Sequence, residues 1–430
     1  MIKNNFNKAG WIRNTTVYEV NLRQYTTEGT INAFLQQLPR LKEMGIHTLW
    51  FMPLTPISEM NRKGSLGSYY ACSDYTAINP EFGTEADFRN LVLVAHKMGF
   101  KVLIDWVANH TGWDHVWTKE RPDFYKKDEH TGQFKIASGM DDIIELDFSN
   151  TDMRKAMINA MAFWVDQFDI DGFRSDLAFW VTLDFWHEAR TALEKKKTLF
   201  WLAEADVLEH ASYLEVFDAA YAWSWMHKTA AFYRNETGFD TLKNLLQQHD
   251  AICGNQAITL WFTSNHDENS WNGTEFEKYG EMALLLSVFS HTWNGIPLVY
   301  SGQEIPNVKR LAFFEKDEIN WDGSYGLQDF FKALNKLNRE NKALLAAEPA
   351  VVSSLADTGE NQNLLVYHRK HGNDEVLVLL NFSASAIAAD VSMNTVSGRY
   401  KNIFTHEEKD FSTWVKESLP PWGYQVYEKR

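Results

Sequence analysis

Eight short runs of apolar and β-branched residues recur between residues 17 and 301, and longer amphipathic stretches separate them. Alternation of this kind is typical of repeated βα units around a parallel sheet. The runs cover residues 17–21, 48–52, 102–107, 172–175, 200–205, 219–223, 258–264 and 297–301. Eight strands that are each followed by a helix close into a barrel, with the functional groups at the carboxyl ends of the strands.

The intervening stretches carry apolar residues at three- and four-residue spacing, which indicates helices with one buried face. The clearest of these cover residues 31–44, 85–98, 153–168, 183–195, 241–249 and 278–291. The sequence therefore predicts an α/β fold, and more narrowly a (β/α)8 TIM barrel.

Two parts of the chain depart from this pattern. Residues 111–151, between the third and fourth predicted strands, are rich in Trp, His, Asp, Lys and Gly and lack helical periodicity, so we expect a small excursion domain there. After Glu340 the pattern changes to short alternating runs broken by Gly, Asn, Ser and Pro, which favours a C-terminal β-sandwich domain. The predicted division is a barrel over 1–110 and 152–345, the excursion over 111–151 and the sandwich over 346–430.

Composition argues against several classes of partner. Lys and Arg total 42 against 57 Asp and Glu, a formal net charge of −15 with no basic cluster, so we expect neither nucleic acid nor a membrane as a partner. The two cysteines, Cys72 and Cys253, lack metal-site spacing and form no disulfide framework. Residues 1–11 lack the apolar stretch of a secretory signal, so we expect a cytoplasmic protein.

Ionisable residues stand at the ends of four predicted strands. The segments are DWVANH (105–110), GFRSD (172–176), FWLAEAD (200–206) and FTSNHDE (262–268). A single acidic residue there could simply cap the following helix. In a barrel, however, Asp176, Glu204 and Asp267 would converge on one mouth, and converging carboxylates repel one another unless cations or a function compensate. Glycosidic bond cleavage with retention uses such a pair, one carboxylate as nucleophile and one protonated carboxyl as acid, about 5 Å apart.

In their order and spacing, these segments resemble the signature regions of the α-amylase family of glycoside hydrolases. GIHTLWFMP (45–53), FGT (82–84) and GIPLVYSGQE (295–304) add to the resemblance. It implies that Asp176 is the nucleophile, that Glu204 is the acid/base and that Asp267 stabilises the transition state through sugar hydroxyls.

The resemblance also implies a set of substrate-binding residues. Arg174 matches the arginine that pairs with the nucleophile and keeps it ionised. His110 and His266 match two histidines that hydrogen-bond the sugar on the non-reducing side of the cleaved bond. Tyr70 matches the tyrosine that stacks on the same ring.

The sequence departs from the family pattern at two adjacent residues, and it contains two candidate calcium ligands. Phe179 and Trp180 stand where many members carry Lys-His, which leaves the reducing-side subsite undefined. Asn109 and Asp147 match residues that hold calcium between the barrel and the excursion, and hard oxygen ligands suit that ion. The alternative is that Asn109 only hydrogen-bonds its loop.

The resemblance implies cleavage of α-1,4 links in starch, glycogen or maltooligosaccharides. Transglycosylation or isomerisation would use the same carboxylates and is the alternative, since only the acceptor differs. A third possibility is a non-catalytic relative that binds glucan or a protein, and the intact carboxylates argue against it.

Overall fold

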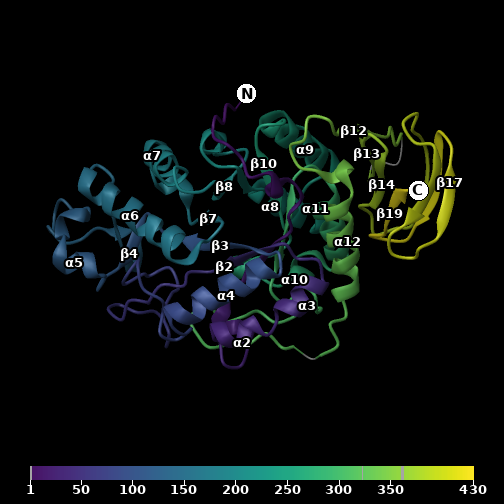
Figure 1. Cartoon of the computed structure of the whole chain (residues 1–430). Coiled ribbons are helices and arrows are strands. Elements are labelled where there is room, and N and C mark those ends of the chain that lie inside the picture. The colour runs from purple at the N-terminus through teal and green to yellow at the C-terminus, as the bar shows by residue number, and fades with distance from the viewer. Residues whose placement is uncertain (1, 322, 360–362) are drawn as a thin grey trace.

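The computed structural model describes residues 2–321, 323–359 and 363–430, and its centre is a closed parallel barrel (Figure 1). The strands follow one another around it in the order β1-β11-β10-β9-β8-β7-β3-β2. Their bounds are β1 Val17–Val20, β2 Thr48–Phe51, β3 Lys101–Trp106, β7 Gly172–Ser175, β8 Phe200–Asp206, β9 Ala219–Tyr221, β10 Ile258–Trp261 and β11 Ile296–Tyr300. All eight predicted runs form these strands, so the (β/α)8 prediction is confirmed.

The side chains of each strand alternate between the barrel interior and the surrounding layer of helices. In β2, Trp50 belongs to an apolar cluster inside the barrel, whereas Leu49 and Phe51 pack into the cluster formed with the surrounding helices. Successive strand residues point to opposite faces, so a strand buried on both faces carries no polar side. Polar groups therefore collect where the strands end.

The helices follow the predicted pattern with two breaks. Their bounds are α1 Leu22–Tyr25, α2 Ile31–Leu35, α3 Leu38–Glu43, α4 Glu85–Lys97, α6 Thr151–Phe168, α7 Leu183–Leu193, α8 Trp223–Tyr233, α9 Phe239–Cys253, α10 Glu275–Tyr279, α11 Met282–Thr292 and α12 Gln328–Glu340. The helix predicted over 31–44 is divided, because Pro39 cannot continue α2 and instead stands in the first turn of α3. The helix predicted over 278–291 is divided at Gly280, whose φ of +49° ends α10. The sequence pattern did not predict α8 or α12.

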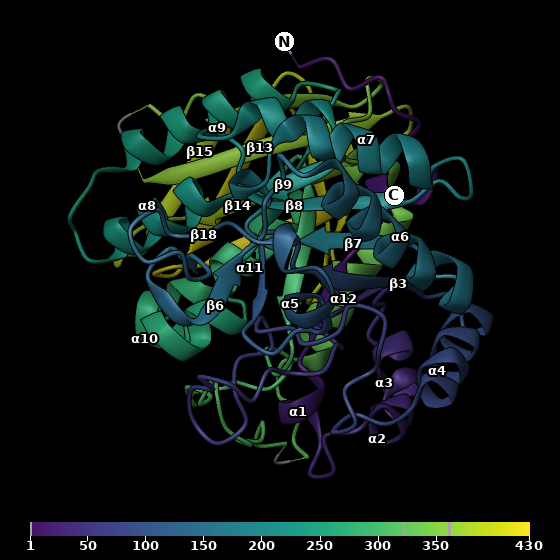
Figure 2. The same cartoon turned by 90° about the vertical axis from the view of Figure 1, so that its left-hand side faces the viewer.

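The segment between β3 and α6 forms its own small sheet, as the excursion prediction implied. Strands β4 (His110–Gly112), β6 (Met140–Glu145) and β5 (Ile136–Ala137) pair antiparallel, and α5 (Val116–Glu120) lies between β4 and β5 in the chain. This segment projects at the left-hand end of Figure 1 and faces the viewer in Figure 2.

The C-terminal part consists of two packed antiparallel sheets, which confirms the predicted sandwich. The larger has the order β12-β13-β14-β19-β16-β17 and the smaller pairs β15 with β18. The bounds are β12 Val352–Leu355, β13 Leu364–His371, β14 Asp374–Asn381, β15 Ile387–Ser392, β16 Gly398–Asn402, β17 Glu408–Phe411, β18 Trp414–Leu419 and β19 Tyr424–Lys429. In β13, Leu364 packs toward the smaller sheet, whereas Leu365 joins a cluster with Leu334 of α12. Helix α12 thus lies between the barrel and the sandwich (Figure 1).

Among the described residues, no helix is both long enough and apolar enough to cross a membrane.

Candidate active site

The residues that the sequence placed at strand ends meet in one cavity. Asp176 follows β7, Glu204 lies in β8, and Asp267 follows β10, while Tyr70 and His110 come from the segments after β2 and β3. All five line a hollow of about 430 Å³, which we call the catalytic cavity. The other two predicted residues, Arg174 and His266, are buried and contact residues that line it.

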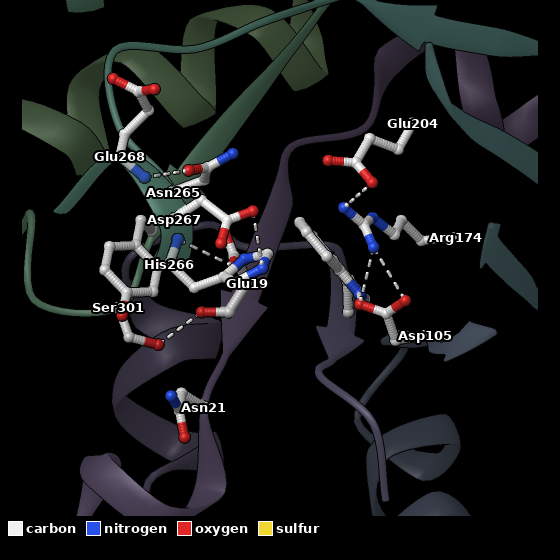
Figure 3. A network of polar contacts seen from close by, with 12 residues as sticks. Glu19, Asn21, Asp105, Arg174, Glu204, Asn265, His266, Asp267, Glu268 and Ser301 are labelled. Carbon is white, nitrogen blue, oxygen red and sulfur yellow. Dashed lines mark hydrogen bonds and ion pairs between the residues drawn. The ribbon is translucent and has the colours of Figure 1, made fainter. Parts of the chain in front are cut away.

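Arg174 connects the carboxylates of this site (Figure 3). Its Nη1 lies 3.0 Å from Asp176 Oδ1 and 2.9 Å from Asp105 Oδ1, and its Nη2 lies 2.9 Å from Glu204 Oε2. The guanidinium is fully buried, so these ion pairs are poorly screened. One cation therefore serves three carboxylates. Asp105 was not among the predicted site residues, although it begins the DWVANH segment.

Burial raises the pKa values of the two principal carboxyls. Burial raises the pKa of Glu204 to about 7. The charge of Arg174 opposes this rise, and the charges of Asp176 and Asp267 add to it. Burial also raises the pKa of Asp176 to about 6. The charge of Arg174 opposes this rise, and the charge of Asp105 adds to it. Removal from water is thus a larger cause of the raised pKa of Glu204 than the charges of its carboxylate neighbours.

The contacts of Glu204 place its proton. Its Oε2 accepts the backbone N–H of Leu177 at 2.8 Å and also faces Arg174. An oxygen that accepts a hydrogen bond and also lies beside a cation is a poor position for a proton, so the neutral acid carries its proton on Oε1.

His110 presents a nitrogen suited to an uncharged ligand. Its Nε2 is buried and has no hydrogen-bond partner within the described part of the chain. Burial lowers the pKa of His110 to about 4, so the ring is neutral near pH 7. A neutral imidazole nitrogen in the cavity wall matches a sugar hydroxyl, which both donates and accepts.

His266 has the opposite charge state. Burial alone would lower its pKa, but the charges of Asp267 and Glu19 raise the pKa of His266 to about 9. Its Nε2 lies 2.7 Å from Tyr70 Oη and 3.3 Å from Asp267 Oδ2. The Tyr70 ring stacks on His266 with centroids 5.5 Å apart.

The remaining walls come from loops that the sequence analysis did not select. Trp271, Phe313 and Phe314 give one wall an apolar, aromatic surface. Met140, Asp142 and Ile143 of β6 form part of another, so the excursion contributes directly to the cavity. Lys63 lies 2.9 Å from Asp142 and 3.1 Å from Asp141, which fastens the excursion to the segment after β2. Flat aromatic faces and charged or polar groups in one hollow suit a sugar ring.

Residues 5–343 match the family model of the α-amylase catalytic domain, and residues 358–426 match that of the maltogenic amylase C-terminal domain. The chain belongs to the α-amylase family. The family resemblance of the sequence is thereby confirmed.

Individual members of the family show the same relationship. The chain is 27% identical to the alpha-amylase MalA of Haloarcula japonica over 423 residues, which is 92% of this chain and 60% of that protein. It therefore spans less than two thirds of that relative's length. A crystal structure of an alpha-amylase from Lactobacillus plantarum superposes with a TM-score of 0.87 at 27% identity, covering 98% of this chain and all of the other. The maltogenic alpha-amylase AmyB from Thermotoga neapolitana gives the same TM-score and identity, with coverage of 97% and 99%.

Phe179 and Trp180, the two departures from the family pattern, are both half-buried. Phe179 stacks on His210 with ring centroids 4.1 Å apart, and Trp180 lies 6.5 Å from the His110 ring. Neither lines the catalytic cavity.

The contacts of Asn109 and Asp147 favour hydrogen bonding over a calcium site. The main-chain carbonyl of Asn109 accepts the N–H of Leu146 at 3.0 Å, and its side-chain Nδ2 lies 3.4 Å from His110 Nδ1. Asp147 Oδ1 accepts both the N–H and the hydroxyl of Ser149. The surface hollow beside Asp147 is lined by three lysines, Lys126, Lys127 and Lys135, and by two further carboxylates, Asp128 and Glu129. No group of three or more His, Cys, Asp or Glu side chains suited to a metal occurs in residues 2–321, 323–359 and 363–430. Calcium stays a prediction, and we derive no chemistry through it.

Proposed function

We propose that this protein hydrolyses α-1,4-glucosidic bonds in starch, glycogen or maltooligosaccharides and retains the configuration of the anomeric carbon. The observation that carries this proposal is the shared guanidinium of Arg174, which holds Asp176 and Glu204 at one cavity. A single cation between two carboxyls of raised pKa favours one ionised and one protonated group near neutral pH. Retaining hydrolysis needs that combination.

In the first step, Asp176 attacks the anomeric carbon while the bond to the leaving oxygen breaks. Glu204 donates its proton to that oxygen, and a covalent glucosyl-enzyme forms on Asp176. Arg174 holds Asp176 in its ionised form, ready to attack.

In the second step, Glu204 removes a proton from water, and the resulting nucleophile displaces Asp176 from the anomeric carbon. Two displacements at one carbon return the original α configuration. Asp267 accepts hydrogen bonds from sugar hydroxyls and stabilises the developing positive charge, while the His110 nitrogen and the Tyr70 ring position the sugar.

The acceptor in the second step decides between hydrolysis and glucosyl transfer. A sugar hydroxyl in place of water would give transglycosylation or isomerisation with the same carboxylates. Incubation with maltoheptaose, followed by NMR and chromatography, tests the proposal. We expect α-anomeric products that are shorter than the substrate. Products longer than maltoheptaose would establish glucosyl transfer, and an initial β-anomer would exclude the retaining mechanism. An unchanged substrate would indicate a protein that binds glucan without cleaving it.

A further inference from the structure

Glu19, a buried carboxylate beside the catalytic cavity, has no role in the mechanism above. It lies in β1, and its side chain is fully buried. Its Oε1 is 2.5 Å from Nδ1 of His266 and accepts the backbone N–H of the same residue at 3.2 Å (Figure 3). Among the described residues, His266 is the only cationic side chain within ion-pair distance of Glu19. A buried carboxylate is stable only when it is paired, so the charge state of the histidine matters.

The hydrogen-bond directions determine how many protons His266 carries. Glu19 can only accept, so Nδ1 of His266 must carry a proton. On the other side of the ring, the Tyr70 hydroxyl donates its single proton to Asp105 Oδ2 at 3.1 Å. The Tyr70 oxygen must therefore accept from Nε2. Asp267 Oδ2, at 3.3 Å from Nε2, is a second acceptor. Both nitrogens carry protons, and the ring is an imidazolium.

We propose that Glu19 is a positioning residue that holds His266 as an imidazolium, so that the Nε2–H of His266 keeps Asp267 and Tyr70 in place at the cavity. The functional part of this inference rests on the proposed glucan hydrolysis. Glu19 does not line the cavity and acts through His266.

Charged groups on five elements face the ring. Glu19 belongs to β1, Tyr70 to the segment after β2, Asp105 to β3 and Arg174 to β7, and Asp267 is the next residue in the chain. Asp267, Glu19 and Asp105 are carboxyls that favour the cation, whereas burial and the charge of Arg174 oppose it. This balance keeps the ring charged through the pH range in which Asp176 is ionised and Glu204 is protonated.

Replacement of Glu19 by Gln keeps the shape and one acceptor but removes the charge. Burial and Arg174 then oppose the cation while Asp267 supports it without the charge of Glu19, so the balance moves toward the neutral ring, whose remaining proton is the one on Nδ1. Nε2 loses its proton, so Tyr70 and Asp267 lose their donor. Asp267 then faces a nitrogen lone pair and moves away from the sugar hydroxyls that it holds.

The test is an NMR titration of the His266 ring in the full chain, combined with kinetics on a maltooligosaccharide. We expect a doubly protonated ring at pH 7.5 in the wild type and an apparent pKa lower by about two units or more in Glu19→Gln, which makes the ring mostly neutral at that pH. We expect kcat to fall by up to about 100-fold because Asp267 is misplaced, with a smaller change in KM. Glu19→Asp retains the charge and should recover part of both losses.

Glu275→Gln is the matched control. Glu275 is also a buried glutamate, and it accepts from Thr263 Oγ1 at 2.8 Å and from Gln303, away from the cavity lining. We expect this variant to leave the His266 titration and kcat within about twofold of the wild type, as for substitutions away from the site.

A singly protonated His266 in the wild type at pH 7.5 would overturn the proposal, whether or not the variants fold. The same titration in Glu19→Gln and in the wild type would also overturn it. If the wild type does not cleave glucans while Glu19→Gln still shifts the titration, the proposed function fails and the charge assignment of His266 stands.

Discussion

Two buried ionic clusters of this protein have opposite balances of charge. In the C-terminal sandwich, Glu375 is paired with Lys370 and Lys429, each at 2.8 Å, and also contacts His368 and Tyr400. Burial alone would raise the pKa of Glu375, but the hydrogen bonds from Lys370 and Lys429 hold it at about 2. The cations outnumber the carboxylate, which is therefore ionised at any physiological pH.

At the catalytic cavity the ratio is reversed, because Arg174 alone faces Asp105, Asp176 and Glu204. The comparison shows what separates a cluster built for stability from one built for chemistry. An excess of cations fixes the protonation state of Glu375. A deficit of cations leaves the cavity carboxyls with raised pKa values, so that one of them can hold and release a proton near neutral pH.

Asp176→Asn is the most direct test of the carboxylate cluster at the catalytic cavity. Loss of the proposed nucleophile should lower kcat/KM on maltooligosaccharides on the order of 10⁴-fold or more. Because Asp176 has a raised folded-state pKa, its ionisation costs stability as the pH rises through about 6. The variant should therefore melt at or above the wild-type temperature at pH 8. A variant that keeps more than a tenth of the activity would move the nucleophile elsewhere.

Replacement of the acid should give a loss that depends on the leaving group. Glu204→Gln should lose roughly 10²- to 10⁴-fold on glucans, whose leaving oxygen needs a proton. An aryl glucoside with an activated leaving group should suffer much less in the glycosylation step, and azide should speed release of the glucosyl group from Asp176. Equal losses on both substrates, without azide rescue, would assign the acid role to another residue.

The pH dependence of kcat/KM tests the charge balance at the catalytic cavity without a mutation. Activity should fall below pH about 6, where Asp176 becomes protonated, and above pH about 7, where Glu204 loses its proton. The profile should be a narrow bell with roughly tenfold loss per pH unit on each limb. Activity that stays constant from pH 5 to pH 9 would show that the two carboxyls do not titrate as the charge balance implies.

Glu375→Gln tests the other cluster. Two lysines would lose their common carboxylate, and we expect a loss of about 1–3 kcal/mol in the free energy of unfolding, with activity at moderate temperature unchanged. The contribution of Glu375 is present above the unfolded pKa of about 4.3 and is lost as the pH falls toward about 2, because its folded-state pKa is depressed. Thermal melts of both proteins at pH 7 and pH 3 check this. An equal difference at both pH values would contradict it.

Much of the site could be predicted because its principal residues follow strands that are visible in the sequence. Asp176 comes directly after one apolar run and Asp267 three residues after another, and a closed barrel brings all strand ends together. Glu19 and Asp105 were missed because each looks like an isolated polar residue within a strand, and only the closed barrel shows which partners it meets. Trp271 lies in a short helical turn, Glu268–Asn272, which is too short for a periodicity to mark it.

The helices show the same limit. Pro39 and Gly280 divide predicted helices for local reasons that the sequence carries, whereas α12 was missed although it is amphipathic. Its buried face depends on packing between the barrel and the sandwich, and residues 302–327 separate it from the last predicted strand. The extents predicted for the three domains stay predictions.

The smallest expected effect concerns calcium between Asn109 and Asp147. Asp147 Oδ1 already accepts two hydrogen bonds from Ser149, so an ion bound through that oxygen would have to displace them. Binding to the folded state alone would raise the melting temperature by mass action. We therefore expect the same melting temperature and activity, within error, with a chelator and with added calcium, and a small, calcium-independent destabilisation in Asp147→Ala from loss of the Ser149 contacts. A chelator-induced fall in both melting temperature and activity that calcium restores in the wild type, but not in Asp147→Ala, would establish the metal site and show that the excursion depends on an ion for its order.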